Sequence, residues 1–242
     1  MSLLALTGVG RDVRLPDDSL LPVLGGVDLT VEPGEHVSIV GRSGSGKSTL
    51  LNVLGLLDSP TAGSYLLDGA DTGSLGGRRR SRLRGETFGF VFQQFNLLPR
   101  RTAEENVAAP LLYARGREFF TRNRAAREML DRVGLGARAL QVPERLSGGE
   151  QQRVAIARSL VRNPRVVLAD EPTGALDVET GAAVMALLAE VTAENGAALI
   201  TITHDLSVAA LAGRRFRLDA GRLTPVADGH ALAAATSDRS EA

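Results

Sequence analysis

The chain has 242 residues and a mass of 25.5 kDa, which is enough to bury a large apolar core as one compact unit. Its 28 basic and 28 acidic residues cancel, so no overall field favours nucleic acid or an anionic membrane as a partner. The absence of cysteine excludes disulfides and thiolate metal sites and fits a reducing compartment. The N-terminus does not resemble a signal peptide, and no run approaches the roughly 18 apolar residues of a membrane span. We therefore expect a soluble cytoplasmic chain that reaches a membrane only through a partner.

A glycine-rich loop stands between a predicted strand at 36–40 and a predicted helix at 48–54. Its pattern is G-x-x-x-x-G-K-S, in which backbone N–H groups surround phosphates, the lysine reaches the terminal phosphates and the serine hydroxyl binds magnesium. Lys47 is the one lysine among 28 basic residues, at a position where a planar guanidinium cannot replace a compact ammonium. The alternative is a flexible Gly/Ser loop that carries this lysine by chance. We predict nucleotide binding by Gly41, Arg42, Ser43, Gly44, Ser45, Gly46, Lys47, Ser48 and Thr49.

An arginine cluster follows a predicted strand at 64–67. Its sequence, RRRSRLR at 78–84, could mark a site for anionic lipid headgroups or nucleic acid. Basic runs are common without such a role, and no interleaved aromatic residues support base stacking. A solvated helix or loop is the favoured interpretation, and we expect no nucleic-acid partner.

The next predicted strand, 87–92, leads to Gln93, after which the sequence pattern changes. From about 94 to 163 the chain is rich in Arg, Ala and Leu and has no convincing strand. This pattern predicts an inserted α-helical subdomain within a single domain of 1–242. Because Gln93 follows a strand end and precedes the insertion, it could touch metal or water while sensing the subdomain.

The segment LSGGEQQR at 146–153 precedes a helix with one apolar side. Ser147 and Glu150 have the spacing of a capping box. The box does not explain two successive glycines, Gly148 and Gly149, which cost backbone entropy unless a group must approach the main chain closely. A second anion site at a helix N-terminus is the natural interpretation. Because the chain has one lysine loop only, this second cradle would serve a nucleotide held by another copy.

An apolar run at 166–169 predicts a strand that ends in two carboxylates, Asp170 and Glu171. Ligands of open α/β sheets bind beyond the carboxyl ends of strands. There Asp170 can hold a magnesium shell while Glu171 polarises an attacking water as a general base. The alternative is an ordinary strand end followed by a turn at 172–174, which the upstream glycine loop argues against.

The apolar run at 198–203 predicts another strand, with His204 at its end. A lone histidine is more often structural than catalytic, but His204 emerges where the sheet presents its site and could donate to a terminal phosphate. A predicted helix at 179–194 and a predicted strand at 215–218 complete the pattern. Buried strands that alternate with helices indicate an α/β fold with a mostly parallel sheet flanked by helices. The Ala- and Ser-rich end, 228–242, predicts a weakly ordered tail.

The order and approximate spacing of these motifs resemble those of ATP-binding cassette (ABC) ATPases over essentially the whole chain. LSGGEQQR is specific to that family among P-loop proteins. The stretches FQQFNLLP at 92–99 and ADEPTG at 169–174 further resemble the lipoprotein-releasing, macrolide-export and cell-division group (LolD, MacB and FtsE types).

Two positions depart from the pattern. Leu15 stands where the family stacks an aromatic residue on adenine, which predicts less base-selective binding. Ala175 stands where the narrower group commonly has asparagine.

The resemblance implies a P-loop NTPase fold with an N-terminal antiparallel β portion. It also implies a head-to-tail dimer of the chain with two ATP molecules and Mg²⁺, each nucleotide lying between the glycine loop of one copy and Ser147, Gly148 and Gly149 of the other. Asp177 would lie at the dimer seam. The catalytic residues would be Glu171, His204, Gln93 and Lys47, and the magnesium ligands Ser48, Gln93 and Asp170.

The helical subdomain would dock on an integral membrane permease at the inner face of the cell membrane. The implied function is the ATP-hydrolysing subunit of an ABC transporter, an exporter or a lipoprotein, lipid, drug or peptide extrusion system. One rival is a regulatory ATPase of the cell-division type, which signals through a membrane partner without moving a solute. A soluble ABC protein of DNA repair or translation is disfavoured, because such chains usually carry two cassettes or a long coiled-coil insertion.

Overall fold

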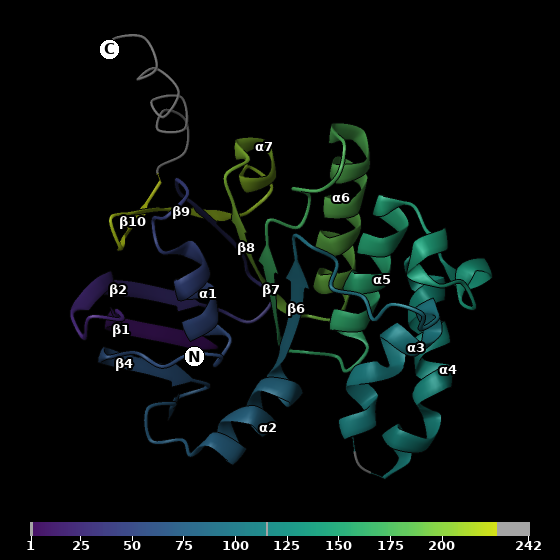
Figure 1. Cartoon of the computed structure of the whole chain (residues 1–242), viewed down its shortest axis with the longest axis horizontal. Helices are drawn as coiled ribbons and strands as arrows, with labels where there is room; N and C mark the ends of the chain where they lie inside the picture. Colours follow the sequence, from purple (N-terminus) through teal and green to yellow (C-terminus); the bar gives the residue numbers. More distant parts are fainter. Residues whose placement is uncertain (1, 115, 227–242) are drawn as a thin grey trace.

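The computed structural model describes residues 2–114 and 116–226, and two sheets organise this part of the chain (Figure 1). The larger sheet has six strands in the order β10-β9-β3-β8-β7-β6, parallel except for β10, which pairs antiparallel with β9. The strands in this order span Arg222–Pro225, Arg214–Asp219, His36–Val40, Ala198–Thr203, Val166–Asp170 and Phe88–Phe92. The predicted α/β class with a mostly parallel sheet is confirmed.

The central strands of this sheet are buried on both faces, as their nearly continuous apolar sequences predict. Alternate residues of β7 enter different cores, because successive side chains of a strand point to opposite faces. Val167 and Ala169 belong to one apolar cluster, and Val166 and Leu168 belong to the other. The sheet therefore separates two cores, and each core holds a different set of helices.

One core lies between the larger sheet and an antiparallel sheet of four strands, in the order β2-β1-β4-β5. Helix α1, Lys47–Leu54, fills this space with the buried side chains of Leu50, Leu51, Val53 and Leu54. The four strands span Leu20–Val31, Leu4–Arg14, Ala62–Leu67 and Ala70–Asp71. The N-terminal antiparallel portion is thus confirmed.

Helices cover the opposite face of the larger sheet (Figure 1). They are α3 (Ala103–Ala108), α4 (Arg117–Arg132), α5 (Gly148–Leu160) and α6 (Val178–Glu194), with short 3₁₀ turns η1 (Ala109–Tyr113), η2 (Gly136–Arg138) and η3 (Pro143–Arg145). The described residues between 94 and 163 form helical turns and no strand. Their apolar side chains share one core with β7 and β8. The boundaries of a separate helical subdomain stay a prediction.

The arginine cluster lies on helix α2, Gly77–Thr87, so the strand predicted from residue 87 begins one residue later, at Phe88. Part of the cluster anchors this helix to the rest of the chain. Arg80 donates to the Ser59 hydroxyl and, at 3.4 Å, to a backbone carbonyl, while Arg84 donates to the Leu56 carbonyl at 3.1 Å. These contacts explain much of the basic run without a ligand.

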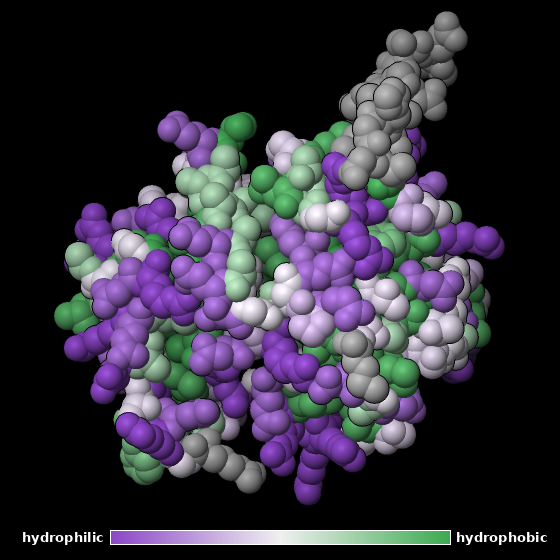
Figure 2. Space-filling model, turned by 180° about the vertical axis from the view of Figure 1, so that it is seen from behind, coloured by the Kyte–Doolittle hydropathy of each residue, from purple (hydrophilic) through white to green (hydrophobic). Residues whose placement is uncertain are grey.

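The face of the molecule opposite to that of Figure 1 is mostly hydrophilic, with hydrophobic residues scattered over it (Figure 2). Within residues 2–114 and 116–226, no helix has the length and apolar character needed to cross a membrane. The tail predicted at 228–242 lies outside the described residues.

Candidate active site

Four neighbouring parallel strands bring most of the predicted site residues to one edge of the larger sheet. Strand β3 leads into the glycine loop, and its last residue pairs with Thr203 of β8, which His204 follows. Asp170, the last residue of β7, pairs with β8 on one side and with Phe92 of β6 on the other. Parallel strands end at the same edge, so these segments meet there although they lie far apart in the sequence, as the pairing of Val40 with Thr203 shows.

The glycine loop leaves backbone N–H groups without partners from side chains at the start of α1. Gly46 occupies the N-cap position with a φ of 100°, which glycine adopts readily, and no side chain caps the helix. At Gly41 a Cβ atom would lie 2.5 Å from the Leu218 carbonyl oxygen, so only glycine fits. The Ser45 hydroxyl is buried and has no hydrogen-bond partner among the described residues. A tight loop with unpaired donors at a helix N-terminus suits phosphate groups.

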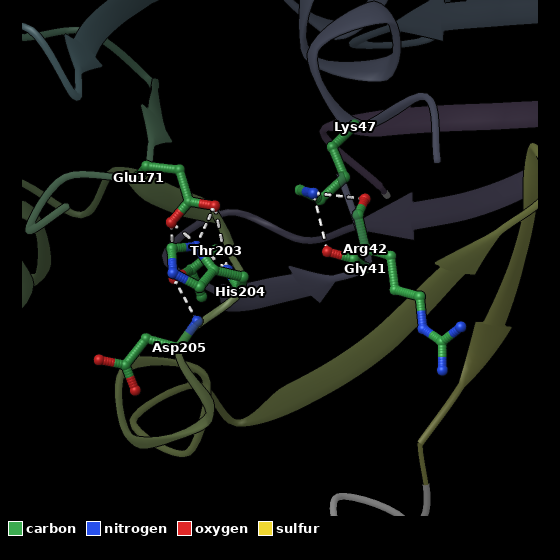
Figure 3. A network of polar contacts seen from close by, with 7 residues as sticks. All are labelled: Gly41, Arg42, Lys47, Glu171, Thr203, His204 and Asp205. Carbon is green, nitrogen blue, oxygen red and sulfur yellow. Dashed lines mark hydrogen bonds and ion pairs between the residues drawn. The ribbon is translucent and has the colours of Figure 1, made fainter. Parts of the chain in front are cut away.

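Lys47 folds back over this loop. Its Nζ donates to the carbonyl oxygens of Gly41 at 2.8 Å and of Arg42 at 2.9 Å (Figure 3). The positive charge of Lys47 also acts on Asp170, whose pKa it lowers. Burial and the neighbouring charge of Glu171 outweigh this effect, so the pKa of Asp170 is raised overall. A cation bound beside Asp170 would favour its charged form.

The residues near Asp170 fit a magnesium ion bound together with phosphates. Magnesium in such sites takes one or two protein ligands and completes its shell with water and phosphate oxygens. Asp170 supplies a half-buried carboxylate, and Ser48 supplies an exposed hydroxyl in the first turn of α1. Within the described ranges, no three His, Cys, Asp or Glu side chains gather into a larger metal cluster.

Glu171 is held in an unusual conformation by several contacts. Its φ is 47°, a left-handed value that costs a residue other than glycine about 1–3 kcal/mol. The carboxylate accepts from the Thr203 hydroxyl at 3.1 Å and from the His204 backbone N–H at 3.1 Å (Figure 3). The backbone N–H of Glu171 donates to the Ile202 carbonyl at 2.8 Å. The end of β8 therefore fixes both the main chain and the side chain of Glu171.

His204 also contacts Glu171, through its ring. Nδ1 of the ring lies 2.8 Å from Oε1 of Glu171. Since a carboxylate accepts, Nδ1 carries a proton, and Nε2 is the ring nitrogen left for a ligand. The Glu171 side chain is 15% exposed and that of His204 is 70% exposed. The pair thus has an enclosed carboxylate and an accessible imidazole.

The predicted second cradle lies at the start of α5 and is exposed at Ser147. The capping box is present: the Ser147 hydroxyl accepts from the Glu150 N–H at 3.2 Å, and Glu150 Oε2 accepts from the Ser147 N–H at 2.8 Å. The latter bond is the main cause of the lowered pKa of Glu150. Packing inside the chain also explains Gly149, because a Cβ there would lie 2.5 Å from Cγ2 of Thr180 on α6. The close approach inferred from the glycines therefore includes a neighbouring helix.

Helix α5 belongs to the core on one face of the larger sheet, whereas α1 belongs to the core on the other face. The glycine loop and the Ser147 cradle are thus carried by helices on opposite faces.

Asp177 is the N-cap of α6 and accepts from the Thr180 N–H at 2.9 Å, which lowers the pKa of Asp177. Leu15 follows β1 and is 37% exposed. The predicted loss of base selectivity stays a prediction.

Gln93 is exposed at the end of β6, where its side chain packs against Gly174. Three further residues of this region were not predicted to belong to the site. Thr203 orients Glu171, and Arg158 donates to the carbonyls of Phe95 and Asn96 in the segment that follows Gln93. The third, Gln152, donates to the carbonyls of Phe92, at the end of β6, and of Pro172, in the turn after β7. Each contacts a segment that is distant in the sequence, which a sequence motif does not reveal.

The fold and the site together define a P-loop ATPase. The ABC transporter family profile matches residues 24–174, and the chain belongs to this family. It is 49% identical over 205 residues to the lipoprotein-releasing system ATP-binding protein LolD of Shewanella frigidimarina, with 85% of each chain covered. It is 51% identical over 228 residues to the macrolide export ATP-binding/permease protein MacB of Rhodospirillum rubrum. That match covers 93% of this chain and 34% of MacB, so the chain spans about a third of such longer relatives.

Among solved structures, the chain resembles the dimeric ATP-binding cassette MJ0796 in a post-hydrolysis state bound to ADP and Pi. The TM-score is 0.82 and the identity 40%, with 93% of this chain and 100% of the other covered. The protein is therefore an ATP-binding cassette ATPase that uses ATP and Mg²⁺, and its resemblance to the LolD and MacB group is confirmed.

Proposed function

We propose that two copies of this chain close head to tail on two MgATP and that this closure drives an integral membrane permease at the inner face of the cell membrane. The placement of the two phosphate cradles on opposite faces of the larger sheet is the observation that supports the dimer most directly. One chain then holds one half of each of two sites. The relative MJ0796 is described as dimeric.

In the proposed site, Glu171 takes a proton from the water that attacks the terminal phosphorus, and ADP leaves with its bridging oxygen. Lys47 and the N–H groups of the glycine loop stabilise the negative charge that develops on the phosphate oxygens. Ser48, Asp170 and Gln93 would hold magnesium, which when bound would supply further neutralisation of the phosphates. His204 donates through Nδ1 to Glu171, and in its doubly protonated, imidazolium form it also donates through Nε2 to the terminal phosphate.

A groove with a volume of about 1290 Å³ supports docking of a membrane subunit. It lies between α2 and β6 on one side and η1 and the start of α4 on the other, with Phe90 and Phe92 stacked in its lining. Arginines outnumber carboxylates among its lining residues, and Tyr113, which also lines it, is 86% exposed. An apolar floor with a basic rim suits an amphipathic segment that carries acidic residues.

LolD and MacB are named for lipoprotein release and macrolide export, and on that basis we propose extrusion of a lipid-linked or amphipathic cargo. The test is to capture the permease from detergent-solubilised membranes with the tagged chain, reconstitute both in vesicles and screen for cargo that stimulates ATP turnover. Turnover without release of any cargo would favour the regulatory role instead.

The Glu171→Gln variant tests the catalytic and dimeric parts of the proposal. A glutamine keeps the size of the side chain but cannot take the proton, so hydrolysis should fall about 100- to 1000-fold while ATP binding is retained. Light scattering should show dimers on addition of MgATP. Glu190→Gln, at an exposed position of α6, is the matched control and should hydrolyse ATP at the rate of the unmodified chain. Unchanged turnover in Glu171→Gln would reject Glu171 as the base, and a monomer at saturating MgATP would reject the dimer.

A further inference from the structure

Gln152 is a fully buried polar side chain that links helix α5 to two strand ends of the site. It has an exposed fraction of 0%. Its Nε2 donates to the Pro172 carbonyl at 2.6 Å and, over a longer distance of 3.4 Å, to the Phe92 carbonyl. Phe92 directly precedes Gln93, and Pro172 directly follows Glu171. One amide group is thus shared by the segments that carry both residues.

The orientation of this amide is determined by its surroundings. Two backbone carbonyl oxygens face the amide group of Gln152. An oxygen can only accept there, so the NH₂ group of the amide, and not its Oε1 atom, points toward them. The Oε1 atom on the other side is buried without a hydrogen-bond partner among the described residues. An unpaired buried acceptor is unfavourable, and an apolar side chain of similar size would avoid it. The amide at this position is therefore best explained by what its NH₂ group holds.

The turn that Gln152 holds is the strained one. Glu171 has its left-handed φ of 47° while its N–H donates to Ile202 and its carbonyl accepts from the Gly174 N–H at 3.0 Å. Such a conformation persists only when the surrounding structure determines it. Pro172 has no N–H, so its carbonyl is the one main-chain polar group by which this residue can be held. Gln152 provides the donor for that carbonyl.

We propose that Gln152 is a positioning residue for ATP hydrolysis: by holding the Pro172 and Phe92 carbonyls, it keeps the Glu171 carboxylate in its reactive position. Without the amide, the Pro172 carbonyl is buried unpaired and the turn relaxes, which moves the carboxylate away from Thr203 and His204. Within the same chain, nucleotide binding depends on the glycine loop and on Lys47, which belong to the start of α1 in the other core, and among the described residues neither is a hydrogen-bond partner of Gln152. The effect should therefore appear in the chemical step.

The test replaces Gln152 by methionine, which has a similar length and no donor. In the full-length chain we expect kcat for ATP to fall about 10- to 100-fold, since small misplacements of a reacting group have costs of this size. The KM for ATP should change by less than about threefold. Gln141→Met, a partly buried glutamine away from the strand ends, is the control and should keep both constants. If Gln152→Met keeps its kcat, or if its KM rises in proportion to the loss, the proposal is overturned.

A double-mutant cycle separates positioning from general loss of structure. If Gln152 acts through Glu171, then Gln152→Met should add almost nothing to the defect of Glu171→Gln in single-turnover hydrolysis. A fully additive loss overturns the proposal. Should Gln152→Met not fold, Gln152→Ala allows the same comparison without crowding the core. The inference concerns hydrolysis by the chain alone, so it fails or stands independently of the membrane partner. An inactive unmodified chain would count against the proposed function, not against Gln152.

Discussion

At the scale of single residues, Lys47 shows why charge alone does not define this site. Its Nζ reaches two carbonyl oxygens of the glycine loop at the same time, which requires a compact donor on a flexible stem. An arginine at 47 would keep the charge, but it would place a planar guanidinium group where the two carbonyl oxygens of the loop converge on the single Nζ atom. The many arginines elsewhere in the chain indicate that composition did not demand a lysine here.

We therefore expect Lys47→Arg to lose most of its ATP hydrolysis, about 100-fold or more, because it removes a stabilising contact to the developing charge. Steady-state turnover, with circular dichroism to verify the fold, measures the effect. The matched control is Arg124→Lys, the reverse exchange on the exposed side of α4, which should leave turnover unchanged. Normal activity of Lys47→Arg would mean that the single lysine is an accident of composition.

Residue types and spacing predicted the loop, Asp170, Glu171 and His204, but not the contacts that make them a unit. The bond between Glu171 and His204 joins residues 33 positions apart and depends on the register of β7 against β8. The left-handed φ of Glu171 is imposed by those contacts, because nothing in a glutamate favours it. Such information is in the tertiary structure and was absent from the local sequence.

At the scale of elements, the two glycines that begin α5 have different surroundings. At Gly148 a Cβ would lie 3.3 Å from the Leu176 side chain, which can adjust, whereas at Gly149 it would lie 2.5 Å from Cγ2 of Thr180. The close packing of α5 on α6 therefore depends on Gly149. The capping-box pattern was read correctly from the sequence, but this helix contact was not.

The Gly149→Ala variant should destabilise the fold by about 1–3 kcal/mol, the usual cost of overpacking, and lower the thermal midpoint. Combining it with Thr180→Ser, which removes the clashing methyl group, should recover most of the loss. Differential scanning calorimetry of the two single variants and the double variant measures this coupling. Losses that simply add would show that Gly149 is needed for another reason.

Strand prediction succeeded where sequences are uniformly apolar, as in β7 and β8, whereas the local pattern predicted no strand over β1 and only the family resemblance implied an antiparallel portion there. The register of β1 shifts between Leu6 and Val9, where Gly8 has a φ of 57°. A bulge of this kind breaks the alternation by which a half-exposed strand is recognised. The partner strand β2 starts with three exposed residues, Leu20, Leu21 and Pro22, and shows no clean alternation either.

At the scale of the whole molecule, the larger sheet separates two apolar cores. The antiparallel sheet and α1 lie on one face, and α3, α4, α5 and α6 lie on the other. The α/β class followed from the alternation of strands and helices, because that alternation is a property of the whole chain. The assignment of each helix to a face did not, since it depends on strand order and crossover direction.

If two copies pair head to tail as proposed, the placement of the two cradles on opposite faces predicts complementation between damaged copies. In a head-to-tail pair, a Lys47→Ala copy still offers its own intact Ser147, and a Ser147→Arg copy still offers its own intact Lys47. Each variant alone should be inactive, whereas a mixture should regain ATP hydrolysis in single-turnover assays, because every mixed pair contains one undamaged site. Mixing two Lys47 variants should restore nothing. In the proposed head-to-tail pair, a site divided between two copies would make the pair, and not the single chain, the unit on which a harmful mutation acts.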